Sequence, residues 1–309
     1  MRRAIIGATA ATLALAAGFT SGALASTAAG PYLCAGTLGK PGVLKGTYPD
    51  GVIVKGVCAV KAGKARVVGT LRVSQGSTLI AAYGLHHSSL TVTGDLVVAK
   101  GGAAVLGCKA NPNGTGLPCL DETNTKHPTL TSHEIVSGNI IESSPLGVIM
   151  HNSAIGGNIK ETGGGGGLSC NVPKSGVFAK IKDPVFSDLE DSTVGGSVTI
   201  SGLTSCWTGL ARDTVHGNVT INNNDMGDPD AIEVLANTIG KNLSCSGNTH
   251  PSAELSAGAL PIWDTADEPP KFLLYPRMPE PNTVAGTRAG QCVTASPTTL
   301  GGPPAAAAF

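Results

Sequence analysis

Short apolar strands separated by glycine-containing turns recur along this chain. Between Asp191 and Leu243 one pattern appears three times: Asp or Asn, a hydroxyl residue, Val or Ile, a glycine, a polar residue, and then Val or Leu. The copies end at Val198, Val219 and Leu243. A repeat of this length that carries strand-forming residues predicts a β-solenoid, in which each repeat forms one coil.

An earlier duplication predicts how the strands are oriented. The pair Leu71 and Val73 is repeated as Leu96 and Val98, one repeat length further along the chain. Side chains alternate between the two faces of a strand, so we expect these four residues to point inward and Arg72 to point outward. A single coil cannot bury its apolar residues alone, whereas stacked coils bury them continuously and form parallel sheets.

Two further segments complete the predicted stack. Gly176–Ala179 lies one short interval before Gly196 and is predicted to be the strand of an intervening coil. The pattern at Asn237 returns at Asn282, which is close to two periods later. We therefore expect about ten coils and a rod of about 50 Å, because strand layers lie about 4.8 Å apart.

Asparagine recurs at one position of the turn. Five polar residues come just before an inward Val, Ile or Leu: Asn139, Asn158, Ser197, Asn218 and Asn242. Stacked asparagines form hydrogen-bonded ladders between neighbouring strands. We expect such a ladder along one edge of the stack.

The segment 1–25 has the pattern of a secretory signal peptide. Two arginines precede an apolar run, which ends in small residues at Ala23–Ala25. This order favours cleavage after Ala25. The alternative is a membrane anchor, but the run is short and rich in Ala and Gly, which disfavours a stable span. We expect a protein that is secreted and remains extracellular or associated with the cell wall.

Eight cysteines lie after the predicted cleavage site. An even number in an exported protein indicates disulfides, and no C-x-x-C pair supports the alternative of a zinc site. From the spacing and the predicted layers we expect Cys34–Cys58 and Cys245–Cys292. We expect Cys108–Cys119 to close the base of a protruding loop, and Cys170–Cys206 is the pair that remains. Cys34–Cys58 and Cys245–Cys292 would fasten the two ends of the stack.

The interruptions of the repeat predict the boundaries. We expect the following organisation: a signal peptide at 1–25, the solenoid at 26–292 with loop excursions at 111–130, 162–175 and 250–281, and a disordered tail at 293–309. The second excursion includes the run Gly163–Gly167. No Lys-Ser/Thr follows this run, so it predicts a flexible loop rather than a phosphate-binding loop.

Charge restricts the classes of partner. The formal net charge of the chain is +0, from 21 basic and 21 acidic residues, and loss of Arg2 and Arg3 with the signal peptide leaves it slightly acidic. Such a chain has no electrostatic footprint for nucleic acid or an anionic membrane. We expect a monomer without a membrane span, and an envelope or extracellular polysaccharide is the partner that fits best.

The repeated G-N-[VI]-x-[IV] strand resembles the right-handed parallel β-helix of the pectate-lyase-like kind. The blocks VFSDLED at 185–191, SCW at 205–207, ANT at 236–238 and GQC at 290–292 are similar to secreted β-helix proteins of Gram-positive bacteria. The resemblance covers most of the mature chain. That group has no assigned activity, so the resemblance implies the fold and no reaction.

The densest acidic stretch contains the candidate site residues. The catalytic candidates are Asp188, Asp191, Arg212 and Asp213, with Glu190 between the first two, and the ligand-binding candidates are Trp207, Asp225, Asp228 and Asp230. Related β-helix enzymes use stacked carboxylates as calcium ligands or as an acid/base pair across a glycosidic bond. Arg212 could serve as the cation of a lyase.

Each candidate has a structural alternative. Aspartates are common in solvated turns, Arg212 could form a surface ion pair, and Trp207 could cover the disulfide of Cys206. We assign no metal ligands and no cofactor from the sequence, and calcium is the one cation that the acidic stretch would suit. Thr199 and Thr220 could form an outward row of threonines.

Two functional hypotheses follow from this inventory. The regular repeat and the scarcity of catalytic motifs favour a structural or binding role outside the cell. The alternative is a polysaccharide lyase or hydrolase that uses the acidic stretch. Convergence of its carboxylates with Arg212 in an open groove would favour the enzyme.

Overall fold

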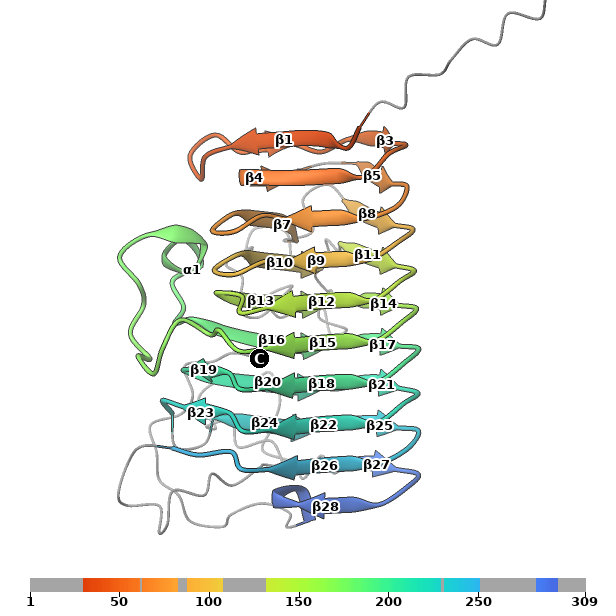
Figure 1. Cartoon of the computed structure of the whole chain (residues 1–309), viewed down its shortest axis with the longest axis vertical. Helices are drawn as coiled ribbons and strands as arrows, with labels where there is room; N and C mark the ends of the chain where they lie inside the picture. The colour runs from red at the N-terminus through yellow and green to blue at the C-terminus, as the bar shows by residue number, and fades with distance from the viewer. Residues whose placement is uncertain are drawn as a thin grey trace, which may run out of the picture.

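The structure, a computed structural model, describes residues 30–61, 63–82, 88–107, 132–228, 231–250 and 282–293. These residues form an all-β structure of parallel sheets, with short strands stacked in layers along one axis (Figure 1). The following lie outside the described residues: the predicted signal peptide, the pair Cys108–Cys119, the excursion at 111–130, all but His250 of the excursion at 250–281, and the predicted tail beyond Val293.

Three ladders of parallel strands make up the stack. The first ladder consists of β1 (Tyr32–Gly36), β4 (Val52–Ala59), β6 (Leu71–Val73), β9 (Leu96–Val98), β12 (Ile140–Ser143), β15 (Ile159–Thr162), β18 (Val198–Ser201), β22 (Val219–Asn222), β26 (Leu243–Ser246) and β28 (Arg288–Gly290). The second ladder consists of β2 (Gly42–Val43), β4, β7 (Thr78–Ala82), β10 (Ala103–Gly107), β13 (Gly147–His151), β16 (Phe186–Glu190), β20 (Trp207–Ala211) and β24 (Ile232–Leu235). The third ladder consists of β3 (Gly46–Tyr48), β5 (Lys64–Val67), β8 (Ser89–Val92), β11 (His133–Val136), β14 (Ser153–Ile155), β17 (Thr193–Val194), β21 (Thr214–Val215), β25 (Thr238–Ile239) and β27 (Thr283–Val284).

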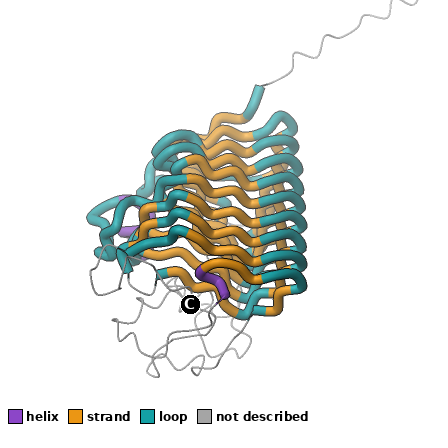
Figure 2. Tube along the Cα trace, turned by 60° about the horizontal axis from the view of Figure 1, so that its bottom comes forward, coloured by secondary structure: helices purple, strands orange, loops and turns teal. Residues whose placement is uncertain are grey.

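The ladders are joined at corners that repeat from layer to layer (Figure 2). The long strand β4 bends at Gly56, whose φ is +79°, so its first half pairs in the first ladder and its second half in the second. This strand therefore joins both ladders into one 17-stranded sheet. A short pair, β19 (Thr204–Ser205) and β23 (Asp225–Met226), lies at another corner.

The predicted register of the first ladder is confirmed. The following residues are neighbours in adjacent strands: Val198 with Val219, Val219 with Leu243, Leu71 with Leu96, Val73 with Val98, and Ile140 with Ile159. These side chains are buried, whereas Arg72 is exposed, as the alternation predicts. The inward Val, Leu and Ile residues of successive layers form one continuous core.

The asparagine ladder is also confirmed. Each backbone N–H in the column donates to the side-chain oxygen of the residue one layer before it, through Asp95, Asn139, Asn158, Ser197, Asn218, Asn242 and Thr287. Asp95 and Thr287 extend the column beyond the residues that the sequence indicated. The column satisfies turn N–H groups that a corner would otherwise leave unpaired.

Two predictions about the stack are wrong, and the first concerns the coil expected between Ile159 and Val198. Ile159 pairs directly with Val198, so no coil lies between them. The segment Gly176–Ala179 belongs instead to the helix α1 (Gly176–Ile181), which lies beside the second ladder (Figure 1). Helical spacing lets Val177, Phe178 and Ile181 all be buried, with Phe178 packed edge-on against Phe186.

The spacing at the other end was also misread. Thr238 pairs directly with Thr283, so the long interval from Asn237 to Asn282 spans one layer and not two. The extra length belongs to an excursion between two adjacent strands. A short interval between two copies of the repeat therefore indicates adjacent layers. A long interval does not reveal the number of layers, because an inserted loop can lengthen a single layer.

The glycine run Gly163–Gly167 lies within the stack. The N–H of Gly165 donates to Pro145 O on one side, and the N–H of Thr204 donates to Gly164 O on the other. All five φ angles are positive, and a Cβ at Gly164 would collide with Pro145 O. The run was predicted to be a flexible loop, whereas these hydrogen bonds fix it between two neighbouring layers.

Three predicted disulfides are confirmed. The bonds Cys34–Cys58, Cys170–Cys206 and Cys245–Cys292 have Cα–Cα distances of 6.2, 4.8 and 5.2 Å. The neighbour of Cys34 in β4 is Val54, so the first bond crosses the bend of β4 instead of joining equivalent positions of two layers. The first and last bonds fasten the first and last strands of the first ladder, β1 and β28, the latter through the short 3-10 helix η2 (Gln291–Val293).

Candidate functional site

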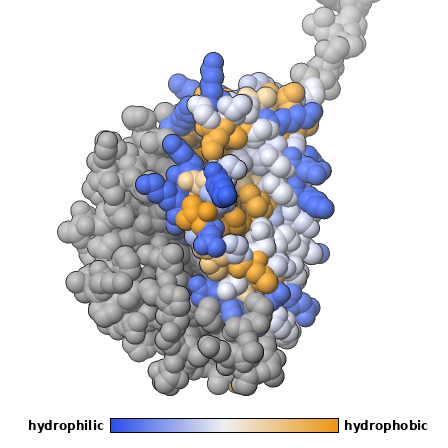
Figure 3. Space-filling model, turned by 90° about the vertical axis from the view of Figure 1, so that its left-hand side faces the viewer, coloured by the Kyte–Doolittle hydropathy of each residue, from blue (hydrophilic) through white to orange (hydrophobic). Residues whose placement is uncertain are grey.

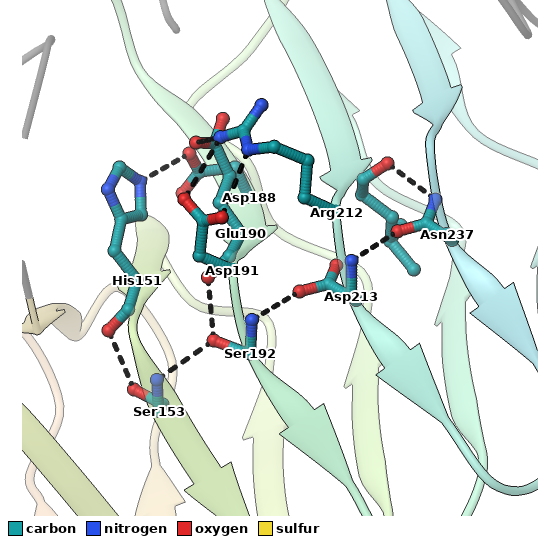
Figure 4. Close-up of polar contacts among 10 residues, drawn as sticks. His151, Ser153, Asp188, Glu190, Asp191, Ser192, Arg212, Asp213 and Asn237 are labelled. Atoms are coloured by element: carbon teal, nitrogen blue, oxygen red, sulfur yellow. Dashed lines mark hydrogen bonds and ion pairs between the residues drawn. The ribbon is translucent and has the colours of Figure 1, made fainter. Parts of the chain in front are cut away.

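Five polar side chains converge where the strands of the second ladder end. His151 is the last residue of β13, and Glu190 is the last residue of β16, its neighbour. Asp188 lies two residues before Glu190 and therefore faces the same side of the sheet. Asp191 and Arg212 follow in the turn, both with left-handed backbones at φ +50° and +60°. We call these five residues the polar cluster (Figure 4).

Direct contacts hold the polar cluster together. His151 Nε2 and Asp188 Oδ2 are 2.9 Å apart. Arg212 donates to Glu190 Oε2 through Nη2 and to Asp191 through Nε and Nη2, the last two at 3.1 and 3.2 Å. The sequence grouped the four residues from Asp188 to Arg212 but did not include His151.

The polar cluster is mostly shielded from solvent. The side chains of His151, Asp188 and Glu190 are 4%, 0% and 4% exposed, whereas those of Asp191 and Arg212 are 12% and 28% exposed. The carboxylates thus converge with Arg212, but three of the five side chains are buried. Only the Arg212–Asp191 side of the polar cluster reaches solvent.

Burial changes the protonation of Glu190. Burial raises the pKa of this carboxyl to about 7, because the charges of Arg212 and His151 offset only part of the loss of hydration. Burial also works against the charge on Arg212, but Glu190 and Asp191 outweigh it and keep the pKa of the guanidinium above its usual value. A carboxylic acid that titrates near neutrality can exchange a proton at physiological pH.

Asp213 does not join the polar cluster. It lies in a second column of stacked polar residues in the interior, which runs through Ser153, Ser192, Asp213 and Asn237 (Figure 4) and continues to Asn282. Asp213 Oδ1 accepts the N–H of Ser192 at 2.8 Å, and burial raises its pKa well above the usual value. Its role in this column is structural.

The other ligand-binding candidates lie elsewhere. Asp225, on β23, accepts a hydrogen bond from Thr249 Oγ1 at 3.1 Å. Asp228 lies beside Cys170 and Cys206, whose sulfur atoms are joined in a disulfide and cannot ligate a metal. Asp230 lies outside the described residues. The structure does not gather Asp225 or Asp228 with Asp188.

Trp207 is part of an aromatic stack. Its ring lies 4.5 Å from that of Phe186 at an interplanar angle of 18°, and Phe186 in turn meets Phe178 of α1. Trp207 is only 3% exposed, so its indole face is not offered to a sugar ring. The structure therefore favours a packing role for Trp207, stacked on Phe186.

An acidic pair in the core was not predicted from the sequence. Glu142 and Glu161 are neighbours in β12 and β15, and both point inward at 2% exposure. Ser187 donates to Glu161 Oε1 at 2.7 Å, and the three residues line a small internal cavity with Asp188. The alternation along the two strands places the glutamates inward, so this signal was present in the sequence.

Two groups of described residues could offer ligand atoms to a metal ion. One comprises Cys170, Cys206 and Asp228, which the disulfide excludes. The other comprises His151, Asp188 and Glu190 of the polar cluster, whose ligand atoms all lie within 4.8 Å of one another. We assigned no metal ligands from the sequence, because its spacing does not bring His151 to this place.

Comparison with known proteins does not assign a function to the polar cluster. No family model, no curated protein and no solved structure matches this chain. Within the part of the chain that the structure describes, no helix is long and apolar enough to cross a membrane.

Proposed function

We propose that this chain is a secreted right-handed parallel β-helix, fastened by disulfides at both ends, with a structural or binding role at the cell envelope or in the extracellular space. Three parallel ladders in register support the β-helix. The bonds Cys34–Cys58 and Cys245–Cys292 lie at the ends of the first ladder and suit an oxidising compartment.

The main support for this role is that the acidic residues form hydrogen bonds and ion pairs within the fold. Asp213 accepts a backbone hydrogen bond within the interior column, and Arg212 pairs with Glu190 and Asp191 across a turn. The face that carries α1 mixes hydrophilic and hydrophobic side chains (Figure 3). Within the polar cluster, the acidic surface that could contact a polymer is the Asp191 edge, because Asp188 and Glu190 are buried.

A regular exposed column offers a binding surface. Four threonines are neighbours in successive strands of the third ladder, and all four are exposed: Thr193, Thr214, Thr238 and Thr283. They repeat about every 4.8 Å along the stack. Such a row of hydroxyls can exchange hydrogen bonds with an extended polysaccharide that lies along the rod.

A pull-down on insoluble envelope polysaccharides tests this role. We expect the wild type to be retained, and retention to fall when Thr214 and Thr238 are both replaced by valine, which keeps the shape and removes the hydroxyls. Replacing Thr199 and Thr220, in the first ladder, by valine is the matched control. A protein that no polysaccharide retains would contradict the binding role.

The alternative is a carbohydrate-active enzyme. The convergence of the polar cluster supports it, whereas the burial of three of its five side chains counts against the open groove that such an enzyme needs. A buried Glu190 whose pKa is near neutrality suits a general acid, and Arg212 could hold an acidic sugar. Cleavage of a polysaccharide that Glu190→Gln abolishes and Asp213→Asn retains would establish the enzyme. That result would contradict the proposed structural or binding role.

A further inference from the structure

The polar cluster holds more negative charge than it neutralises. Asp188, Glu190 and Asp191 carry carboxylates, and Arg212 is the guanidinium that pairs with Glu190 and Asp191. With a neutral His151, the ionised polar cluster has two excess negative charges. Burying unneutralised charge is costly, so a dication or added protons must offset it.

Two carboxylate oxygens lack partners. Asp188 Oδ1 and Glu190 Oε1 are buried, and neither has a hydrogen-bond partner. The opposite oxygens are engaged, Asp188 Oδ2 with His151 and Glu190 Oε2 with Arg212. Arg212 therefore holds Glu190 through one oxygen, and both carboxylates keep their other oxygen available for a cation.

The geometry points to a site for a divalent transition-metal ion, with zinc the best match, formed by His151, Asp188 and Glu190. One ligand atom from each residue lies within 4.8 Å of the others. Ligand atoms around a tetrahedral zinc at about 2.1 Å lie about 3.4 Å apart, so small side-chain movements would close the site. Three protein ligands leave the fourth position open to water or another ligand.

The imidazole of His151 favours zinc and similar ions over calcium and magnesium. Calcium and magnesium prefer shells made of oxygen, whereas zinc and similar ions accept imidazole together with carboxylates. Arg212 would bind Glu190 from behind and fix its orientation, as outer partners of metal ligands do. This site is independent of the proposed binding role and could exist with or without it.

Zinc titration of the chelator-treated, untagged and disulfide-bonded protein tests the site. Calorimetry and elemental analysis should find one zinc per chain, and calcium should not compete. His151→Gln and Asp188→Asn should each weaken binding at least about tenfold, because loss of an outer partner alone has that effect. Asp213→Asn removes a nearby buried carboxyl outside the site and should bind zinc as the wild type does.

Several outcomes would overturn the site. These are the absence of stoichiometric zinc, equal competition by calcium, or unchanged binding in both folded ligand variants; protons alone would then offset the charge. If the variants do not fold, cobalt added to the wild type provides a second measurement. A visible absorption band typical of nitrogen and oxygen ligands supports the site, and its absence contradicts it.

Discussion

Glu142 and Glu161 lie side by side in adjacent strands of the first ladder, and both point into the core. Burial and the neighbouring carboxylates raise the pKa of Glu142 well above its usual value and that of Glu161 to about 7. Two adjacent carboxylates in an apolar interior cannot both be ionised without a large cost. The folded protein therefore retains protons here that the unfolded chain would release.

The first prediction concerns pH. Because the folded pKa is raised, the folded state binds more protons than the unfolded state between about pH 4.5 and 7. The free energy of unfolding should be highest below this range and fall as the pH rises through 7, by on the order of a few kcal/mol. Denaturant unfolding from pH 4.5 to 8.5 measures this slope.

Glu142→Gln is the matched variant for this slope. It removes one titrating group and the repulsion of Glu161, so the loss of stability between pH 5 and 8 should be smaller than in the wild type. Glu190 and Asp213 also have raised pKa values and would keep part of the slope. A wild-type protein that becomes more stable as the pH rises through 7 would contradict the inward placement of the two glutamates.

A second prediction concerns the interior column. Asn237 Nδ2 donates to Leu210 O at 2.8 Å, whereas Asp213 Oδ2, one layer earlier, is buried without a partner. An amide at position 213 would supply a donor there. Asp213→Asn should therefore stabilise the protein by about 1 kcal/mol at pH 8, where an ionised Asp213 is most costly.

Thermal unfolding at pH 5 and pH 8 checks this effect. The gain should be larger at pH 8, because the protonated Asp213 can itself donate at the lower pH. Asn237→Asp is the reciprocal variant and should destabilise the protein. An Asp213→Asn protein that melts well below the wild type at pH 8 would show that the charged carboxylate is needed in the column.

A third prediction tests the core register. Val219 is fully buried between Val198 and Leu243, while its neighbour Thr220 points outward. Val219→Asp should cost several kcal/mol, because it places an unpaired charge in the core. Thr220→Asp, on the opposite face of the same strand, should change stability by less than about 1 kcal/mol. Equal melting temperatures for the two variants would refute the alternation of this strand.

The sequence predicted the parts of the fold that repeat with a short period. The neighbours Val198 and Val219 and the asparagine ladder follow from spacing, because each layer places the same residue type at the same position. The end disulfides were predicted from the same spacing, but neither joins equivalent positions, since Cys34 pairs with Val54 and Cys245 with Gly290. The helix α1 did not follow, since its short apolar segment fits a strand or a helix equally well. Its packing against Phe186 determines the helix.

The polar cluster could be predicted only in part. Asp188, Glu190 and Asp191 are adjacent in the sequence, and Arg212 lies one short repeat later. His151 is hidden by the insertion that separates β15 from β18, which makes that layer much longer than its neighbours. Only the direct pairing of β13 with β16 brings His151 beside Glu190.

The central claim is that this scaffold binds an extracellular polymer without cleaving it. The most direct measurement incubates the wild type with a panel of envelope polysaccharides and quantifies both retained protein and released sugar in the same samples. We predict retention that depends on Thr214 and Thr238, with no released product above a protein-free blank. Released oligosaccharide that disappears in Glu190→Gln would contradict the claim.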